Sequence, residues 1–185
     1  MAHRFPGEEK ARLRDEHRRK AQPAEDIISR MSLREDEVVV DLGCGTGYLT
    51  VPMAARAAKV IGVDAQAEML QALRDMLPEG SDNVELIQAE LPPVPLEDRS
   101  VDRAVIVNVF HEVGDKPLMA REVLRVLRPG GRLSLVEFPR RETSFGPPLE
   151  ERMEADEVIA FFKGLRIEGR WDLMEYYQLE LVKPD

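Results

Sequence analysis

A glycine-rich segment and the acidic residue that follows it are the part of this chain best suited to bind a ligand. The segment is Asp41-Leu-Gly-Cys-Gly-Thr-Gly47, directly after the β-branched run Val38-Val-Val. Glycines let a backbone turn sharply after a strand and approach a ligand where a side chain would collide. Asp64 ends a second apolar run, and its carboxylate can accept hydrogen bonds from both vicinal hydroxyls of a ribose. The pattern predicts a nucleotide-type cofactor site; a structural turn with a surface aspartate is the alternative.

These residues need strands that bring them to one edge of a sheet. Strand and helix patterns alternate at regular spacing, which predicts an α/β fold with right-handed crossovers and helices on both faces. We expect a doubly wound, seven-stranded, mostly parallel sheet with an antiparallel last strand, because the final link is too short for a crossover. The expected strands begin at Val38 and cover 60–63, 84–88, 101–107, 133–138, 165–171 and 176–182, with helices over 48–58, 65–77, 117–127 and 153–163.

The glycine spacing discriminates between two kinds of cofactor. The dinucleotide fingerprint G-x-G-x-x-G has its third glycine three positions after the second. Tyr48 is at that position here, and the pattern is G-x-G-x-G. The spacing therefore disfavours NAD, and an NAD(P)-dependent oxidoreductase is kept only as a minor alternative.

Four segments together match a known family. They are Val38-Val-Val-Asp-Leu-Gly-Cys-Gly-Thr-Gly, Val60-Ile-Gly-Val-Asp-Ala-Gln-Ala-Glu-Met-Leu, Ala89-Glu90-Leu91 and Leu127-Arg-Pro-Gly-Gly-Arg-Leu. With them the sequence resembles the class I S-adenosylmethionine (AdoMet)-dependent methyltransferases, in particular small members related to the ubiquinone/menaquinone-biosynthesis (methyltransferase type 11) group. The resemblance implies a Rossmann-like fold, AdoMet as cofactor, and methyl transfer to a small-molecule acceptor by direct in-line displacement. A catalytically silent AdoMet-binding or regulatory subunit on the same fold is the alternative.

The resemblance also assigns residues to the methionine end of AdoMet. The backbone around Gly43 and Gly45 would face the methionine, and Asp41 would orient its amino group. Asn108, expected at the end of the fourth strand, would border the sulfonium.

A second group of residues is assigned to the nucleoside end. Asp64 would hold the ribose, and Ala65 would line the adenine. Glu90 would accept a hydrogen bond from the adenine amino group, while Leu91 would cover the ring. Glu90 replaces the usual Asp of the family, and Ala89 replaces the usual Gly.

His111 is the candidate catalytic residue. It lies in Asn108-Val-Phe-His-Glu112, just beyond the expected fourth strand. A general base is needed only if the acceptor must lose a proton during the attack. The alternative is a histidine that shapes the pocket wall. Glu112 and Glu137 are weaker candidates for the same role.

The N-terminal segment is basic, whereas the rest of the chain is acidic. Residues 1–22 carry seven basic and four acidic side chains. One interpretation is the solvated face of a helix. The other is a helical cap over residues 1–32 that closes on the cofactor, so that His17, Arg18 and Arg19 contact substrate. We expect one methyltransferase domain over 1–185, with its Rossmann-like core over 36–185.

Composition narrows the classes of partner. The net charge is −9, from 26 basic and 35 acidic residues, which disfavours a nucleic acid because phosphate contacts need a basic face. One cysteine and three scattered histidines predict no metal site. No apolar run approaches a membrane span or a signal peptide, so a cytoplasmic location is expected. Little of the chain lies outside the expected sheet and helices, so we expect a small acceptor, or one bound against a second subunit of a homodimer.

Overall fold

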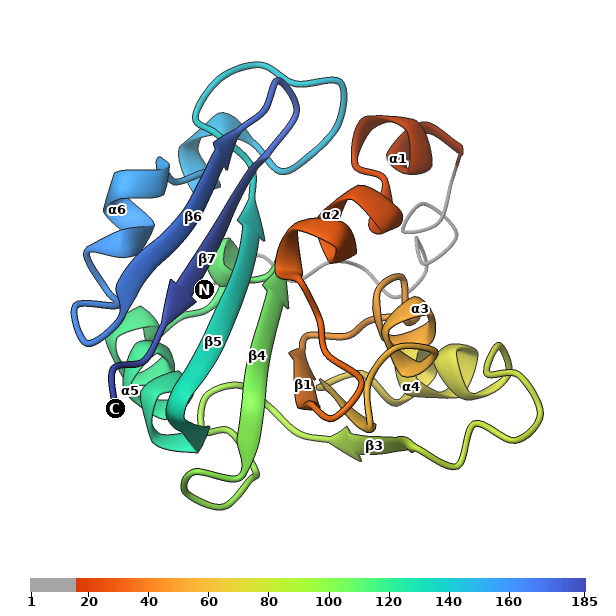
Figure 1. Ribbon diagram of the computed structural model, residues 1–185. Helices are drawn as coiled ribbons and strands as arrows, with labels where there is room; N and C mark the ends of the chain where they lie inside the picture. Colours follow the sequence, from red (N-terminus) through yellow and green to blue (C-terminus); the bar gives the residue numbers. More distant parts are fainter. Residues whose placement is uncertain (1–15) are drawn as a thin grey trace.

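The computed structural model describes residues 16–185, which are arranged around one seven-stranded sheet (Figure 1). The strands are β1 (Val38–Leu42), β2 (Lys59–Asp64), β3 (Val84–Gln88), β4 (Val101–Val107), β5 (Leu127–Glu137), β6 (Arg166–Asp172) and β7 (Tyr177–Val182). Their order across the sheet is β3-β2-β1-β4-β5-β7-β6. Strands β1 to β5 pair in parallel, whereas β7 is antiparallel to both β5 and β6. The predicted sheet is confirmed.

Helices cover both faces of this sheet. They are α1 (Glu16–Ala21), α2 (Ala24–Met31), α3 (Thr50–Ala54), α4 (Ala67–Arg74), α5 (Lys116–Val126) and α6 (Ala155–Ile159), with 3-10 turns at Phe110–Glu112 and Leu149–Glu151. On one face, Met119 of α5 and Val158 of α6 pack against apolar residues of β4, β5 and β7. On the other, Ile27 of α2 and Met53 of α3 pack against β1, β2, β4 and β5. Within residues 16–185, no helix is long and apolar enough to cross a membrane.

The start of β5 differs from the sequence expectation. The run Arg-Pro-Gly-Gly predicts a loop before a strand over 133–138, but β5 begins at Leu127. The sheet accommodates these residues by an irregular register, in which Val101 is the partner of Leu127 and Arg103 is the partner of Arg132. Such an irregularity leaves the extra residues of β5 out of the pairing with β4 and bends the strand locally.

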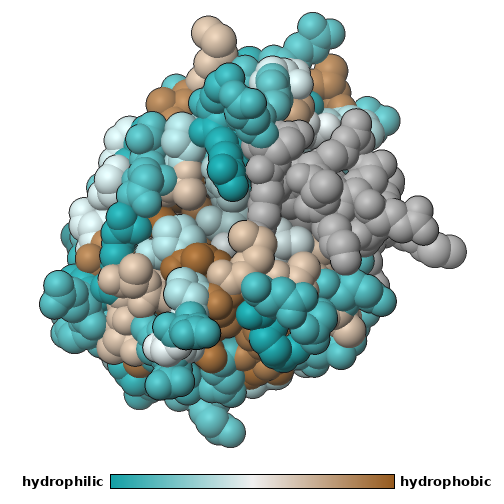
Figure 2. Space-filling model, turned by 90° about the vertical axis from the view of Figure 1, so that its right-hand side faces the viewer, coloured by the Kyte–Doolittle hydropathy of each residue, from teal (hydrophilic) through white to brown (hydrophobic). Residues whose placement is uncertain are grey.

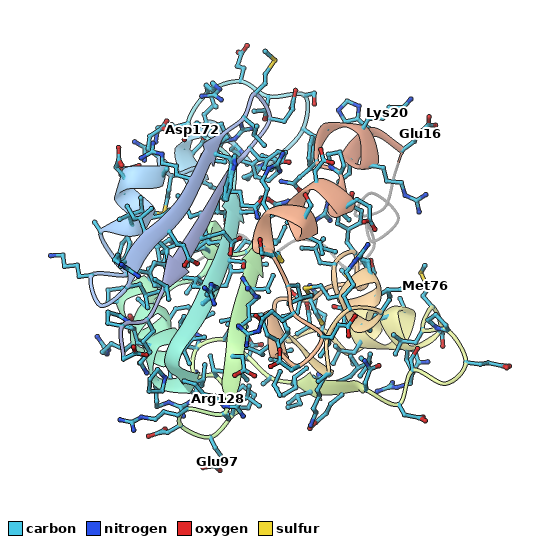
Figure 3. All side chains as sticks on the ribbon, viewed as in Figure 1. Glu16, Lys20, Met76, Glu97, Arg128 and Asp172 are labelled. Atoms are coloured by element: carbon cyan, nitrogen blue, oxygen red, sulfur yellow. The ribbon has the colours of Figure 1, made fainter. Side chains whose placement is uncertain are left out.

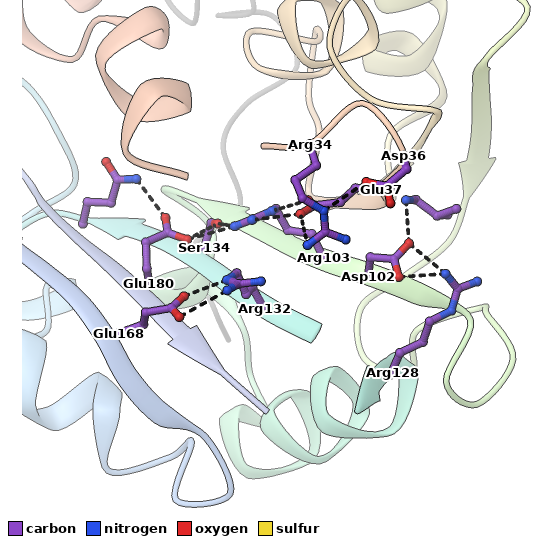
Figure 4. Close-up of polar contacts among 12 residues, drawn as sticks. Arg34, Asp36, Glu37, Asp102, Arg103, Arg128, Arg132, Ser134, Glu168 and Glu180 are labelled. Atoms are coloured by element: carbon purple, nitrogen blue, oxygen red, sulfur yellow. Dashed lines mark hydrogen bonds and ion pairs between the residues drawn. The ribbon is translucent and has the colours of Figure 1, made fainter. Parts of the chain in front are cut away.

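A network of charged side chains is buried in the sheet face that α2 covers (Figure 4). The fully buried Arg103 of β4 donates to Glu37 Oε2 at 2.8 Å, to Ser134 Oγ at 2.8 Å and to Glu180 Oε2 at 3.0 Å. Burial raises the pKa of Glu180 to about 7, against the opposing effects of Arg103, Ser134 and Gln178. Removing one partner of a buried ion pair costs about 3–5 kcal/mol. The network therefore ties the residue before β1 to β4, β5 and β7.

Candidate functional site

The glycine loop at the carboxyl end of β1 is held against β2. The backbone N–H groups of Gly43 and Cys44 both donate to the carbonyl of Val63, at 2.8 and 3.0 Å. Gly43 and Gly45 have φ of +78° and +53°, a left-handed conformation that side chains disfavour. A Cβ on Gly43 would lie 2.5 Å from Cγ2 of Val109. Both conformation and space therefore require glycine at position 43.

Asp64, the last residue of β2, links this loop to the end of the neighbouring strand. Its Oδ2 accepts from the backbone N–H of Gly45, and its Oδ1 accepts from that of Gln66, both at 2.9 Å. Its carbonyl accepts from the N–H of Ala89 at 3.0 Å, which brings the segment after β3 alongside. An ionised carboxylate only accepts hydrogen bonds, which is the chemistry that ribose hydroxyls require.

Asp41 is buried beneath the loop, and burial changes its acidity. Its side chain accepts from the hydroxyl of Thr50 at 2.6 Å, and the residue is 3% exposed. Burial raises the pKa of Asp41 to about 6, with a further increase from Asp64, while the Thr50 bond and the charge of Arg18 oppose the shift. This arrangement suits a ligand that carries both an ammonium and a carboxylate, because the Asp41 carboxylate attracts the ammonium and the Arg18 guanidinium attracts the carboxylate.

The described part of the N-terminal segment covers this region. Arg18 of α1 is 8% exposed, and its guanidinium carbon is 4.2 Å from the centre of the Tyr48 ring. The Tyr48 hydroxyl donates to the carbonyl of Gln22 at 2.8 Å. The fully buried Gln22 side chain exchanges two hydrogen bonds with the amide of Asn108, at 3.2 and 2.7 Å. Residues 16–22 therefore contact both Tyr48, directly after the glycine loop, and Asn108, directly after β4.

Some side chains of α1 are solvent-exposed and one is buried, so each of the two interpretations of the N-terminal segment, a solvated helix face and a covering cap, fits part of this helix. His17 and Arg19 are exposed, as a solvated helix face predicts. Arg18 is buried at the loop, as a covering element predicts. The His17 ring also contacts the Phe145 ring edge-on, with 5.8 Å between ring centres. The remainder of the predicted cap, residues 1–15, lies outside the described residues.

The residues assigned to adenine lie beside Asp64. Ala65 follows it directly, and its carbonyl accepts from the side-chain amide of Gln88 at 3.2 Å. Beyond β3, Glu90 is exposed and Leu91 is partly buried against the main apolar core. The fold thus brings these assigned residues to neighbouring strand ends, at the same edge of the sheet as the glycine loop.

His111 lies on the adjoining strand end, in the 3-10 turn after β4. Its Nδ1 is 2.8 Å from Oε2 and 3.0 Å from Oε1 of Glu137, the last residue of β5. The two side chains are only 5% and 3% exposed. Sequence reasoning considered Glu137 only as an alternative base; the structure shows it as the hydrogen-bond partner of His111.

The aromatic side chain of Phe138, directly after β5, packs next to this histidine, and that of Phe145, in the loop over residues 139–152, packs next to Phe138. The Phe138 ring is 6.4 Å from the His111 ring and 5.1 Å from the Phe145 ring, centre to centre, with edge-on geometry in both pairs. The buried Arg152 donates to backbone carbonyls within the loop and lies 5.5 Å above the Phe138 ring. Sequence reasoning missed these three residues, and the glycine–proline–proline run within the loop was the available signal.

A groove of about 470 Å³ opens beside the glycine loop, on the face that Figure 2 shows. Its lining residues are Arg19, Pro23, Ala24, Glu25, Gly47, Tyr48, Val51, Pro52 and Met76. Met76, labelled in Figure 3, is 50% exposed at its rim. Asp41, Asp64 and His111 do not line this groove, but it shares Gly47 and Tyr48 with the region described above. Within residues 16–185, no group of three or more His, Cys, Asp or Glu side chains is placed to hold a metal ion.

The fold and the position of the glycine loop define the class of protein. The crystal structure of an AdoMet-dependent methyltransferase from Aquifex aeolicus matches with a TM-score of 0.88, over 97% of this chain and 99% of that one. The two sequences are 24% identical, so this similarity concerns the fold. The architecture is the Rossmann-like fold of class I methyltransferases.

Sequence comparison identifies the family. Residues 39–131, half of the chain, match the family model described as "Methyltransferase domain". The chain belongs to this family of AdoMet-dependent methyltransferase domains, which confirms the predicted family and cofactor and argues against the nicotinamide alternative.

Curated relatives match over part of their length. An uncharacterized methyltransferase of Mycobacterium tuberculosis is 44% identical over 104 residues, which is 56% of this chain and 41% of the relative. A ubiquinone/menaquinone biosynthesis C-methyltransferase of Hahella chejuensis is 37% identical over 118 residues, 61% of this chain and 47% of the relative. The aligned region thus spans less than half of each of these relatives.

Proposed function

We propose that this protein transfers a methyl group from AdoMet to a small-molecule acceptor by direct in-line displacement. The observation that carries the proposal is one arrangement at the carboxyl edge of the sheet. The buried Asp41, the left-handed glycines and Asp64 lie at the ends of β1 and β2, and Asn108 and His111 follow the adjacent β4. In open α/β sheets, ligands bind outside these strand ends, at the point where the strand order reverses.

The chemistry of the residues fits AdoMet. Asp41 is positioned to orient the amino group, with Arg18 nearby as a positive charge for the carboxylate. The backbone around Gly43 and Gly45 faces the methionine, and Asp64 holds the ribose. When bound, AdoMet supplies a methyl group already activated by a sulfonium, so the protein must orient the reactants and exclude water.

The remaining assigned residues complete the binding site in this proposal. Ala65 and Leu91 line the adenine, and Glu90 accepts from its amino group. Asn108, whose φ is +57°, borders the sulfonium.

The acceptor side supports a small substrate. Among residues 16–185, α1 with its turn to α2 and the loop over 139–152 reach this edge from beyond the sheet. The buried Phe138 ring packs against His111, and the partly exposed Phe145 ring packs edge-on against Phe138. Phe145 thus adds aromatic surface at this end, which suits a flat apolar molecule. The aligned relative from Hahella chejuensis, named for ubiquinone and menaquinone biosynthesis, is consistent with such an acceptor. His111 is the residue we propose as general base.

Calorimetry tests the cofactor site. We expect AdoMet and S-adenosylhomocysteine to bind, and NAD not to bind. Asp64→Asn should weaken AdoMet binding by about 1–3 kcal/mol, on the order of 10- to 100-fold, because ribose hydroxyls lose a charged acceptor. Asp82→Asn, at an exposed aspartate before β3, is the matched control and should bind as the wild type does. Equal affinity of all three proteins would contradict the proposed site.

Label transfer tests the catalytic part of the proposal. The protein is incubated with methyl-labelled AdoMet and a metabolite extract, and the products are separated by mass. We expect label in a small molecule, and less of it with Asp64→Asn. Tight AdoMet binding without label in any compound would instead support the catalytically silent AdoMet-binding subunit.

A further inference from the structure

The imidazole of His111 is held on one side by a carboxylate. Both oxygens of Glu137 lie within hydrogen-bond distance of Nδ1, at 2.8 and 3.0 Å. The backbone N–H of His111 donates to Oε1 of the same carboxylate at 3.1 Å. One side chain therefore contacts both the ring and the backbone of the histidine, which limits rotation of the ring.

The strands dictate this contact. Glu137 is the last residue of β5, and His111 is in the turn that follows the neighbouring β4. The parallel pairing of Val107 with Val136 brings the two strand ends side by side. The Phe138 ring then meets the imidazole edge-on, so the pair is enclosed by apolar surface as well as by the sheet.

Charged groups from several elements surround the ring. Glu112 Oε1 lies 3.7 Å from Nε2, and Glu151 acts from the 3-10 turn Leu149–Glu151, near the end of the loop over 139–152. Burial lowers the pKa of His111, but the charge and hydrogen bond of Glu137 raise it, with smaller contributions from Glu112 and Glu151, so that the net pKa lies above 6.5. Lys116 Nζ, the nearby cation, donates to the carbonyl of His111 at 3.1 Å.

We propose that Glu137 is a positioning residue that holds His111 as the Nδ1–H tautomer, with Nε2 as the base for an uncharged acceptor that attacks through a hydroxyl or an acidic C–H group. The inference rests on the proposed function of the site and adds the class of acceptor. A hydrogen bond at one ring nitrogen determines which nitrogen accepts the next proton, and a carboxylate stabilises the imidazolium that forms.

The proton and electron balance follows from this geometry. The acceptor oxygen or carbon forms the new bond to the methyl carbon while the carbon–sulfur bond breaks and its electron pair stays on sulfur. The proton of the attacking group moves to Nε2 of His111, and the imidazolium is balanced by the carboxylate of Glu137. The proton then passes to solvent, which regenerates the neutral ring.

The class of acceptor follows from the charges. A phenolic hydroxyl has a pKa near 10, so it remains protonated at neutral pH and benefits from a base. A carboxylate acceptor has no proton to lose at neutral pH, and Glu112, Glu137 and Glu151 around the ring would repel it. The acceptor that matches this site is therefore neutral, with a proton on the attacking atom.

Nuclear magnetic resonance of ¹⁵N-histidine-labelled full-length protein tests the positioning role without any acceptor. The signals of the three histidines are assigned with His111→Asn. We expect neutral His111 to be the Nδ1–H tautomer, and we expect Glu137→Gln to lower its pKa more than Glu112→Gln does. Glu137→Asp, which keeps the charge, should restore part of the shift. An Nε2–H tautomer in the wild type, or equal His111 pKa values in the wild type and Glu137→Gln, would overturn the proposal.

Two further readouts separate this proposal from the proposed function. AdoMet affinity, measured by calorimetry on the same proteins, should be similar in the wild type and Glu137→Gln. This affinity tests the proposed cofactor site. The titration of His111 tests the role of Glu137 and is measured without AdoMet. Products labelled from methyl-labelled AdoMet are then sorted by the methylated atom. We expect methyl groups on hydroxyl oxygen or on carbon, whereas a methyl ester formed on a carboxylate would overturn the acceptor class.

Discussion

The side-chain amides of Gln22 and Asn108 form two reciprocal hydrogen bonds between residues 86 positions apart in the chain. Each amide donates to the oxygen of the other, at 3.2 and 2.7 Å, and Gln22 is fully buried. Asn108 has φ of +57°, a left-handed conformation that ends the extended backbone of β4. This pair joins the turn between α1 and α2 to the strand end where the methyl group is proposed to be transferred.

Gln22→Ala should loosen the N-terminal helix. The substitution removes both bonds and leaves the partly buried amide of Asn108 without this partner, at a cost of about 1–3 kcal/mol. We expect faster hydrogen exchange over residues 16–22 and a lower free energy of unfolding. Gln71→Ala, at an exposed glutamine of α4, is the control and should change neither. Unchanged exchange over 16–22 in Gln22→Ala would show that the amide pair does not hold α1 in place.

AdoMet affinity should increase as the pH rises through about 6. Burial raises the pKa of Asp41 to about 6 in the free protein, and an ammonium group bound beside it would lower that pKa again. AdoMet therefore prefers the ionised form, and its binding at pH 6 should release about half a proton. Calorimetry in buffers of different ionisation enthalpy measures this release. Asp41→Asn should bind more weakly at pH 8 and lose the pH dependence; the same pH dependence in this variant would contradict the assignment.

Gly47→Ala should destabilise the protein more than Gly80→Ala. Both glycines have φ of +82°, so the conformational cost of a side chain is matched. A Cβ on Gly47 would lie 2.1 Å from Cδ1 of Leu73, whereas one on Gly80 would have no neighbour within 4 Å. Overpacking of this kind adds about 1–3 kcal/mol. Urea unfolding measures the difference, and in a Leu73→Ala background Gly47→Ala should cost less. Equal losses for the two glycine variants would exclude the clash.

Glu180→Gln should change how stability depends on pH. Burial raises the pKa of Glu180 from 4.5 to about 7. Between these values the folded state binds more protons than the unfolded state, so this group lowers stability as the pH rises. The free energy of unfolding of Glu180→Gln, minus that of the wild type, should therefore increase from pH 5 to pH 8, on the order of 1–3 kcal/mol.

Glu168→Gln provides the contrast, with urea unfolding at several pH values as the measurement. Arg132 bonds to Glu168 at 2.7 Å and lowers its pKa, so that carboxylate stabilises the folded state at higher pH. The pair is partly exposed, and its removal should cost less than about 1 kcal/mol, with the opposite dependence on pH. Parallel pH profiles for wild type and Glu180→Gln would show that Glu180 does not titrate in this range.

Local patterns predicted most of the sheet. The strands predicted over 84–88 and 101–107 have the bounds of β3 and β4, and the short link after β6 predicted the antiparallel pairing of β7. Helix bounds were less accurate: α3 has five residues where the pattern predicts 48–58, and α4 ends at Arg74 rather than Leu77. Helix ends depend on tertiary packing as well as on local preference, so a single-sequence pattern extends them too far.

The sequence alone determined the family, the order of the elements and the part of the site that lies within one β-loop-α unit. The glycines and Asp64 belong to adjacent segments, and their spacing already implied that they meet, as the bond from Gly45 N–H to Asp64 confirms. Only the tertiary structure decided that Gln22 pairs with Asn108 and that Glu137 holds His111. These partners are far apart in the chain, and their contact depends on strand register and on how α1 packs. A polar contact between two distant elements leaves no local pattern in the sequence. Only the folded arrangement of the strand ends shows which side chains form hydrogen bonds with each other.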